Sequence, residues 1–82
     1  EAREPMVDVF DEGDHLLVVA ELPGVDANDI CFEVKEDVLN LSATHGDRKY
    51  RKEVLRPSAV SAQAATSSYR NGVFEIKLPK AK

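Results

Sequence analysis

Apolar and polar residues alternate with a period of two along most of this chain, and this alternation restricts the fold more than any other feature. It is clearest in residues 30–35 and 74–78, where every second side chain is aliphatic or aromatic. Successive side chains of an extended strand point to opposite faces, whereas a helix repeats every 3.6 residues. The pattern therefore predicts strands that each have one buried face.

Turn signals divide the alternating segments into hairpins. A polar trio at 12–14 separates 7–10 from 16–20, and Glu36 with Asp37 separates 30–35 from 39–43. Asn71–Gly72 predicts a type I′ turn, which needs two residues that tolerate positive φ. Between the first two hairpins, Pro23 cannot donate to a ladder. We therefore expect the strand to end at residues 22–25 and the chain to cross to a second sheet, with Asp26, Asn28 and Asp29 capping a short turn.

Three segments are less regular. Residues 16–20 are apolar at every position, which predicts a central strand covered on one face by the opposing sheet and on the other by an arm or subunit. Residues 45–52 are polar and basic and are interpreted as a loop leading into a strand that Pro57 closes. Residues 58–68 are rich in alanine and serine, so a helix starting at Pro57 is an alternative, but we favour a loop running into a strand at about Ala65 to Tyr69. About seven strands result, which predicts an all-β, immunoglobulin-like antiparallel sandwich.

Length and composition set further limits. The 82 residues allow one domain, 1–82. A hydrophobic content of 43% with 32% charged residues is typical of a folded chain. No apolar run approaches the roughly 20 residues that cross a bilayer, so no membrane is expected as a partner. Cys31 is the single cysteine, which favours a reducing, cytoplasmic location. The chain lacks an initiator methionine and ends just after a strand, so we expect it to be a piece of a longer protein.

Charge is distributed unevenly. Residues 1–37 hold twelve acidic and two basic residues, while residues 38–82 hold three acidic and nine basic ones. The two halves can therefore attract each other within or between chains. A basic cluster in the second half could contact nucleic acid, but pairing with the acidic half of a neighbouring subunit is favoured, and no nucleic-acid partner is expected. The cluster comprises Arg48, Lys49, Arg51, Lys52 and Arg56.

Residues that often carry chemistry are present, but their pattern does not predict a reaction. His15 and His45 are isolated and lie beside turns, so no metal site is expected. Cys31 has no histidine near it in sequence, and turn capping or a strand face explains the carboxylates at 26–37. No glycine-rich phosphate loop occurs. The chain is therefore predicted not to be an enzyme and to need no cofactor.

Three segments, in this order and spacing, resemble the α-crystallin domain of small heat-shock proteins. Residues 19–25, Val-Ala-Glu-Leu-Pro-Gly-Val, followed by Asp29 and Ile30, resemble the family's strand, "LPGV" turn and next strand. Residues 37–43 are similar to its Gly-Val-Leu-x-Ile-x-Ala strand. Residues 68–79, Ser-Tyr-Arg-Asn-Gly-Val-Phe-Glu-Ile-Lys-Leu-Pro, resemble its closing hairpin.

The resemblance implies an ATP-independent chaperone that binds unfolding client proteins and prevents their aggregation. It places a partner-binding groove between the strand at 30–35 and the one at 65–69, because unpaired strand edges are templates for another extended chain. The candidate lining residues are Ile30, Phe32, Val34, Ala65, Ser67 and Tyr69. The alternative is a co-chaperone or scaffold domain of the related sandwich fold that binds one specific folded partner.

The resemblance also implies self-association, with several departures from the family pattern. The segment at 45–53 is short for members that exchange an extra strand, so we expect a homodimer to form through an edge strand whose interface residues are Tyr50, Arg51, Lys52, Glu53, Val54 and Leu55. Lys52 stands where the family has an arginine that pairs charges across the dimer, which removes the planar fork. Arg56–Pro57 replaces a Leu-Pro pair. The 82 residues do not include the Ile-x-Ile/Val tail that links dimers into larger oligomers, so we expect no large assemblies from this piece alone.

Overall fold

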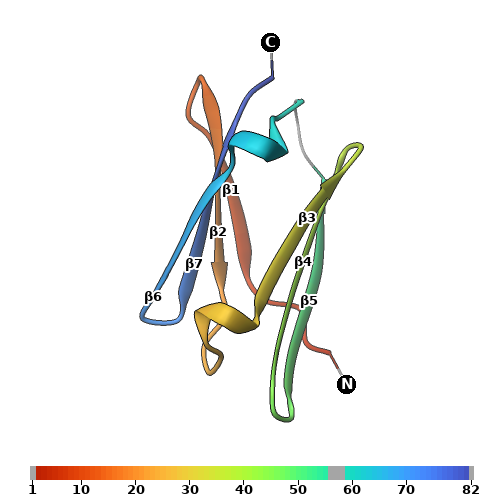
Figure 1. Ribbon diagram of the computed structural model, residues 1–82, viewed down its shortest axis with the longest axis vertical. Helices are drawn as coiled ribbons and strands as arrows, with labels where there is room; N and C mark the ends of the chain where they lie inside the picture. Colours follow the sequence, from red (N-terminus) through yellow and green to blue (C-terminus); the bar gives the residue numbers. More distant parts are fainter. Residues whose placement is uncertain (1, 56–58, 82) are drawn as a thin grey trace.

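Seven strands form two antiparallel sheets in the computed structural model, which describes residues 2–55 and 59–81 (Figure 1). The four-stranded sheet has the order β1-β2-β7-β6, and the three-stranded sheet has the order β3-β4-β5. The bounds are Val7–Asp11 for β1, His15–Glu21 for β2, Ile30–Lys35 for β3, Val38–His45 for β4, Arg48–Leu55 for β5, Thr66–Arg70 for β6 and Val73–Pro79 for β7. The described residues contain no α-helix, only the short 3₁₀ helices η1 (Ala27–Asp29) and η2 (Ala62–Ala64). The predicted antiparallel sandwich is confirmed.

The hairpins follow the turn residues. Asn71 and Gly72 have φ of 53° and 80°, so both central residues adopt the left-handed backbone conformation that a type I′ turn requires. The turn places Arg70 opposite Val73 and continues the β6–β7 ladder from there. Between β2 and β3 the chain leaves one sheet and enters the other, as Pro23 and its neighbours predict.

The core lies between the two sheets and comes from the central strands. Alternate residues of β2 and β7 point inward and meet alternate residues of β4, and most of them are completely buried: Leu16, Val18, Ala20, Leu39, Leu41, Ala43, Phe74, Ile76 and Leu78. Burying one such aliphatic side chain is worth about 1.5–3 kcal/mol. The alternation in the sequence therefore corresponds directly to the inner and outer faces of the sheets.

The segment at 45–52 differs from the prediction of a loop. β4 continues to His45 and β5 starts at Arg48, so only Gly46 and Asp47 form the connection. Gly46 has φ of 61°, and glycine at the first central position suits a type II′ hairpin turn. The strand starts earlier than predicted, and the alternation does not mark its first residues because β5 is an edge strand whose residues are mostly charged and exposed.

Residues 59–65 form no long helix. Val60 bridges Lys80, and η2 is a single short turn before β6 begins at Thr66, one residue later than expected. The Arg56–Pro57 departure and the alternative helix start at Pro57 lie outside the described residues. No helix in the described part of the chain is long and apolar enough to span a membrane.

Candidate functional site

Two strand edges lie on the same side of the sandwich. β3 ends the three-stranded sheet and β6 ends the four-stranded sheet. The opposite edges, β5 and β1, are linked by the N-terminal segment, because Arg3 is hydrogen-bonded to β5 and β1 begins shortly after it. β3 and β6 therefore bound the other margin of the sandwich, where the resemblance places the client groove.

The inner faces of both edge strands remain partly open at this margin. The central strand β4 buries Leu39, Leu41 and Ala43 to 2% exposure or less. The residues predicted to line the groove, in contrast, are half-buried, except Ser67, which is exposed: Ile30, Phe32, Val34, Ala65 and Tyr69. Ser67 lies opposite Ile76, so it shares the inward face of the sheet. The structure thus brings the predicted residues to one margin and shows that they face the interior.

Aromatic contacts support this margin from within. The rings of Phe32 and Phe74 are 6.1 Å apart between centroids and tilted by 52°, a separation at which aromatic pairs attract. Phe74 belongs to β7, next to β6, so the contact joins the two sheets directly behind the open edges.

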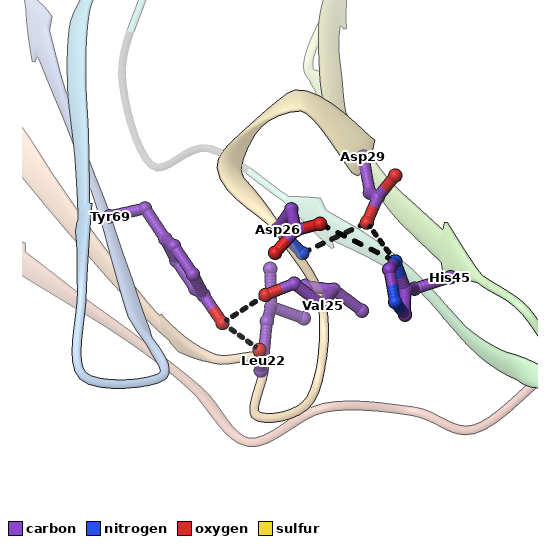
Figure 2. A network of polar contacts seen from close by, with 6 residues as sticks. All are labelled: Leu22, Val25, Asp26, Asp29, His45 and Tyr69. Carbon is purple, nitrogen blue, oxygen red and sulfur yellow. Dashed lines mark hydrogen bonds and ion pairs between the residues drawn. The ribbon is translucent and has the colours of Figure 1, made fainter.

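Tyr69 also forms hydrogen bonds that the sequence did not indicate. Its hydroxyl lies 2.7 Å from the carbonyl oxygen of Leu22 and 3.0 Å from that of Val25. Figure 2 shows the side chain reaching from β6 to the segment that crosses between the sheets. Tyr50 holds the same segment from β5, because its hydroxyl donates to the carbonyl oxygen of Pro23 at 2.8 Å. Two tyrosines from different sheets therefore clamp the crossover segment, residues 22–25.

The residues predicted for a dimer interface fall on the two opposite faces of β5. Tyr50 is only 6% exposed and belongs to the core. Lys52 and Val54 share its inward face and are half-buried. Arg51, Glu53 and Leu55 point outward and are exposed, and Leu55 at 77% is the most exposed large apolar side chain of the described residues. The backbone edge of β5, together with these outward side chains, is what a partner strand would contact.

Part of that backbone edge already has a partner within the chain. The Arg3 amide donates to the Lys49 carbonyl, and the Arg51 amide donates to the Arg3 carbonyl, both at 2.9 Å. This forms a short parallel bridge between residue 3 and Tyr50. In Figure 1 the N-terminal segment runs from beside β5 to β1.

A polar cluster ties η1 to the end of β4 (Figure 2). The Asp29 carboxylate accepts the Asp26 amide at 2.9 Å and lies 2.8 Å from His45 Nδ1. The bond from the Asp26 amide lowers the pKa of Asp29; partial burial opposes this, and His45 acts in the lowering direction. A second carboxylate, from Asp26, is 3.7 Å from the same imidazole nitrogen. Asp26 and Asp29 form the predicted cap, whereas no capping bond of Asn28 is found among the described residues. His45 is a strand residue with a carboxylate partner.

The same three side chains are those best placed to hold a cation among the described residues. Asp26, Asp29 and His45 offer one ligand atom each within 4.8 Å of one another, and zinc accepts carboxylate and imidazole ligands. Capping of η1 and the Asp29–His45 bond already account for the arrangement. His15 is elsewhere, bonded to Asp14 at 2.6 Å, so the two histidines do not form a common site.

The other candidates stay dispersed. Cys31 is a free, exposed thiol on the outer face of β3. The basic cluster is divided, because Arg48, Lys49 and Arg51 are exposed while Lys52 lies 3.6 Å from Glu4. Arg56 lies outside the described residues. Arg51 lines one surface pocket with Cys31 and another with Lys52, whereas Arg48 and Lys49 line a third.

Comparison with known proteins agrees with this architecture. No family model matches the chain. A probable 15 kDa heat shock protein of Leptospira interrogans is 24% identical over 92 residues, which cover 95% of this chain and 71% of that protein. Heat shock protein 16.0 from Schizosaccharomyces pombe superposes with a TM-score of 0.85 at 21% identity, covering 99% of this chain and 69% of that one. A mutant of hsp14.1 from Sulfolobus gives 0.83 at 26% identity, covering 99% and 75%.

The resemblance to the small heat-shock proteins is confirmed. The α-crystallin-type sandwich explains why the three matched segments occur in this order: they are the crossover from β2 to β3, the strand β4 and the closing β6–β7 hairpin. Sequence reasoning did not find the tyrosine clamp, the Asp29–His45 link or the bridge from Arg3 to β5. Each joins residues at least 16 positions apart, and none carries a local signal.

Proposed function

We propose that this chain is a chaperone domain that binds extended segments of unfolding proteins at the margin between β3 and β6, without ATP and without catalysis. The observation that carries the proposal is that the inner faces of two adjacent edge strands remain partly exposed, while the central strands are sealed. An unpaired edge offers backbone donors and acceptors to an extended chain, and the half-buried apolar side chains offer contacts beside it.

The expected affinity is low, which suits a protein that holds clients temporarily. Each apolar side chain buried at the margin contributes about 1.5–3 kcal/mol, from which the ordering of the client must be subtracted. Several weak sites in an assembly raise the avidity without any new contact. The proposal therefore includes a homodimer that forms through the edge of β5. It also places the protein's action in the cytoplasm.

Two serines of β6 provide a matched test of the client site. Ser67 and Ser68 are both exposed, but Ser67 shares the inward face with Ile76 whereas Ser68 lies opposite Glu75 on the outer face. Ser67→Lys places a charged chain across the margin, while Ser68→Lys adds the same charge outside it. Because both positions are exposed, neither substitution should greatly change stability.

The measurement is light scattering from several unrelated clients during heating, at stoichiometric excess of the chain. We expect the unmodified chain and Ser68→Lys to suppress scattering and Ser67→Lys to lose most of the effect. Equal protection by both variants would place client binding elsewhere on the molecule. Protection of no client by the unmodified chain would reject the chaperone proposal and favour a domain that binds one specific folded partner.

The dimer has a test of its own. The amide of Arg51 points away from β4, since it bonds to Arg3, and the amides of alternate residues of a strand point the same way. Glu53 therefore also presents its amide at the free edge. Glu53→Pro removes that donor without breaking the β4–β5 ladder, and sedimentation equilibrium should show loss of the dimer.

A further inference from the structure

The N-terminal strap, residues 2–4, occupies backbone groups that a second copy of this chain needs. The strap uses the Arg51 amide and the Lys49 carbonyl of β5. The Glu4 side chain of the strap forms an ion pair of 3.6 Å with Lys52. Because solvent reaches this pair, it is weak. The next residue, Pro5, is buried, and the Met6 carbonyl accepts the Glu21 amide at 2.9 Å. The strap thus has a firm anchor at its inner end and a lightly held outer end.

Alternation along β5 shows which groups remain free. Residues 49, 51, 53 and 55 direct their amides and carbonyls away from β4, because Lys49 and Arg51 bond to the strap. The strap takes the first half of this edge. Among the described residues, no hydrogen bond outside the strands is formed by the backbone of Glu53 or Leu55.

Charge decides which pairing of two β5 strands is favourable. Two copies related by a twofold axis form an isologous, self-complementary contact. If only the free half of the edge is used, Val54 is at the centre and each Glu53 lies opposite the second copy's Leu55, so the ladder is short and pairs no opposite charges. If Glu53 is at the centre, two Glu53 side chains lie directly opposite each other, which is destabilising. If Lys52 is at the centre, Arg51 lies opposite the second copy's Glu53, and Lys49 lies opposite its Leu55.

The register centred on Lys52 pairs opposite charges and engages the whole exposed edge, but it requires the atoms that bind the strap. The two Lys52 side chains then lie opposite each other on the inner face of the joined strands. Because like charges repel, the dimer is expected to be weak. Strap and partner strand cannot both bond to the Arg51 amide. The occupied edge of one protomer is therefore closed to a second.

We infer that the strap is an intramolecular competitor for the dimer edge, so that a second copy binds by its β5 strand only when residues 2–4 lift away from Arg51 and Lys49. The inference rests on the proposed dimer through β5. It specifies what regulates that dimer: any change that weakens the strap strengthens self-association. Both protomers must release a strap, so the effect of one strap on the dimer dissociation constant is squared.

Two substitutions at the same position test this. Arg3→Pro removes the amide that donates to Lys49, whereas Arg3→Ala removes the same charge and keeps the amide. One hydrogen bond is worth roughly threefold to tenfold in an equilibrium constant. After squaring, we expect Arg3→Pro to dimerise about tenfold or more tightly than Arg3→Ala in sedimentation equilibrium of the 82-residue chain.

Glu53→Pro separates the failure of this inference from the failure of the dimer proposal. If Glu53→Pro abolishes the dimer while Arg3→Pro and Arg3→Ala behave alike, the strap inference is wrong and the β5 dimer stands. If Glu53→Pro dimerises normally, or if no form of the chain dimerises, both are wrong. Weaker dimerisation of Arg3→Pro would make the strap part of the interface and overturn the inference.

A measurement on the unmodified chain avoids dependence on folding of the variants. Proton–proton Overhauser contacts between residues 3 and 50 should be present in the monomer, where the two residues are bridged. We expect them to disappear as the concentration rises and the dimer forms. Contacts that persist in the dimer would refute the competition.

Discussion

Tyr69→Phe removes one hydroxyl and leaves the ring in place, so it tests how strongly the tyrosine clamp stabilises the fold. The hydroxyl serves the carbonyls of Leu22 and Val25. These residues are 0% and 7% exposed, so water has little access to the carbonyls once the hydroxyl is gone. A typical net hydrogen bond is worth about 1 kcal/mol, and a buried polar group left without a partner costs about 1–3 kcal/mol.

From these terms we expect Tyr69→Phe to lower the free energy of unfolding by about 2 kcal/mol. For a chain of this size that corresponds to roughly 8–16 °C in the thermal midpoint. Urea unfolding followed by circular dichroism measures the change directly, and the m-value should not change, because the same surface is exposed on unfolding.

Tyr50→Phe is the matched control. It removes a hydroxyl that donates to the carbonyl of Pro23 and accepts a long bond of 3.5 Å from Arg48. Pro23 is an exposed residue and the Arg48 bond is at the distance limit, so the cost should be about 1 kcal/mol. A Tyr69→Phe protein within about 0.5 kcal/mol of the unmodified chain, or one more stable than Tyr50→Phe, would refute the view that the crossover segment depends mainly on Tyr69.

Three further outcomes follow from the structure. Asp29 has a lowered pKa in the folded chain, so its contribution to the free energy of unfolding is present above the unfolded pKa and lost as the pH falls through the folded value. Urea unfolding between about pH 2 and 6 should therefore show that the stability difference between the unmodified chain and Asp29→Asn shrinks toward acid. A difference that stays constant with pH would contradict the assignment. Asn71→Ala places a less tolerant residue at φ of 53° and should cost about 1 kcal/mol in the same assay, whereas Asn71→Gly should be close to neutral. Ile76→Val removes one methylene at a site of 0% exposure and should cost about 0.5–1.5 kcal/mol; a negligible loss would mean that the core relaxes around the gap.

Strands with alternating faces could be assigned from the sequence because their signal is local. The inward residues of β3 and β7 are those that the alternation marks as apolar, and Asn71–Gly72 adopts the conformation its residue types favour. β5 was partly mistaken for a loop because a strand at the edge of a sheet has mostly charged, exposed residues. Of its inward residues, Tyr50 and Val54 are apolar but Lys52 between them is charged, so no apolar period shows.

The sequence by itself determined most of the strands and turns, the crossover at Pro23 and the likeness to small heat-shock proteins, because backbone preference and side-chain alternation act between near neighbours. The tertiary structure alone decided which edges are open, that two tyrosines clamp the crossover segment, and that residue 3 lies on β5. These contacts join residues that are far apart in the chain. Their bond partners become defined only when the two sheets have packed and brought the edges to fixed positions.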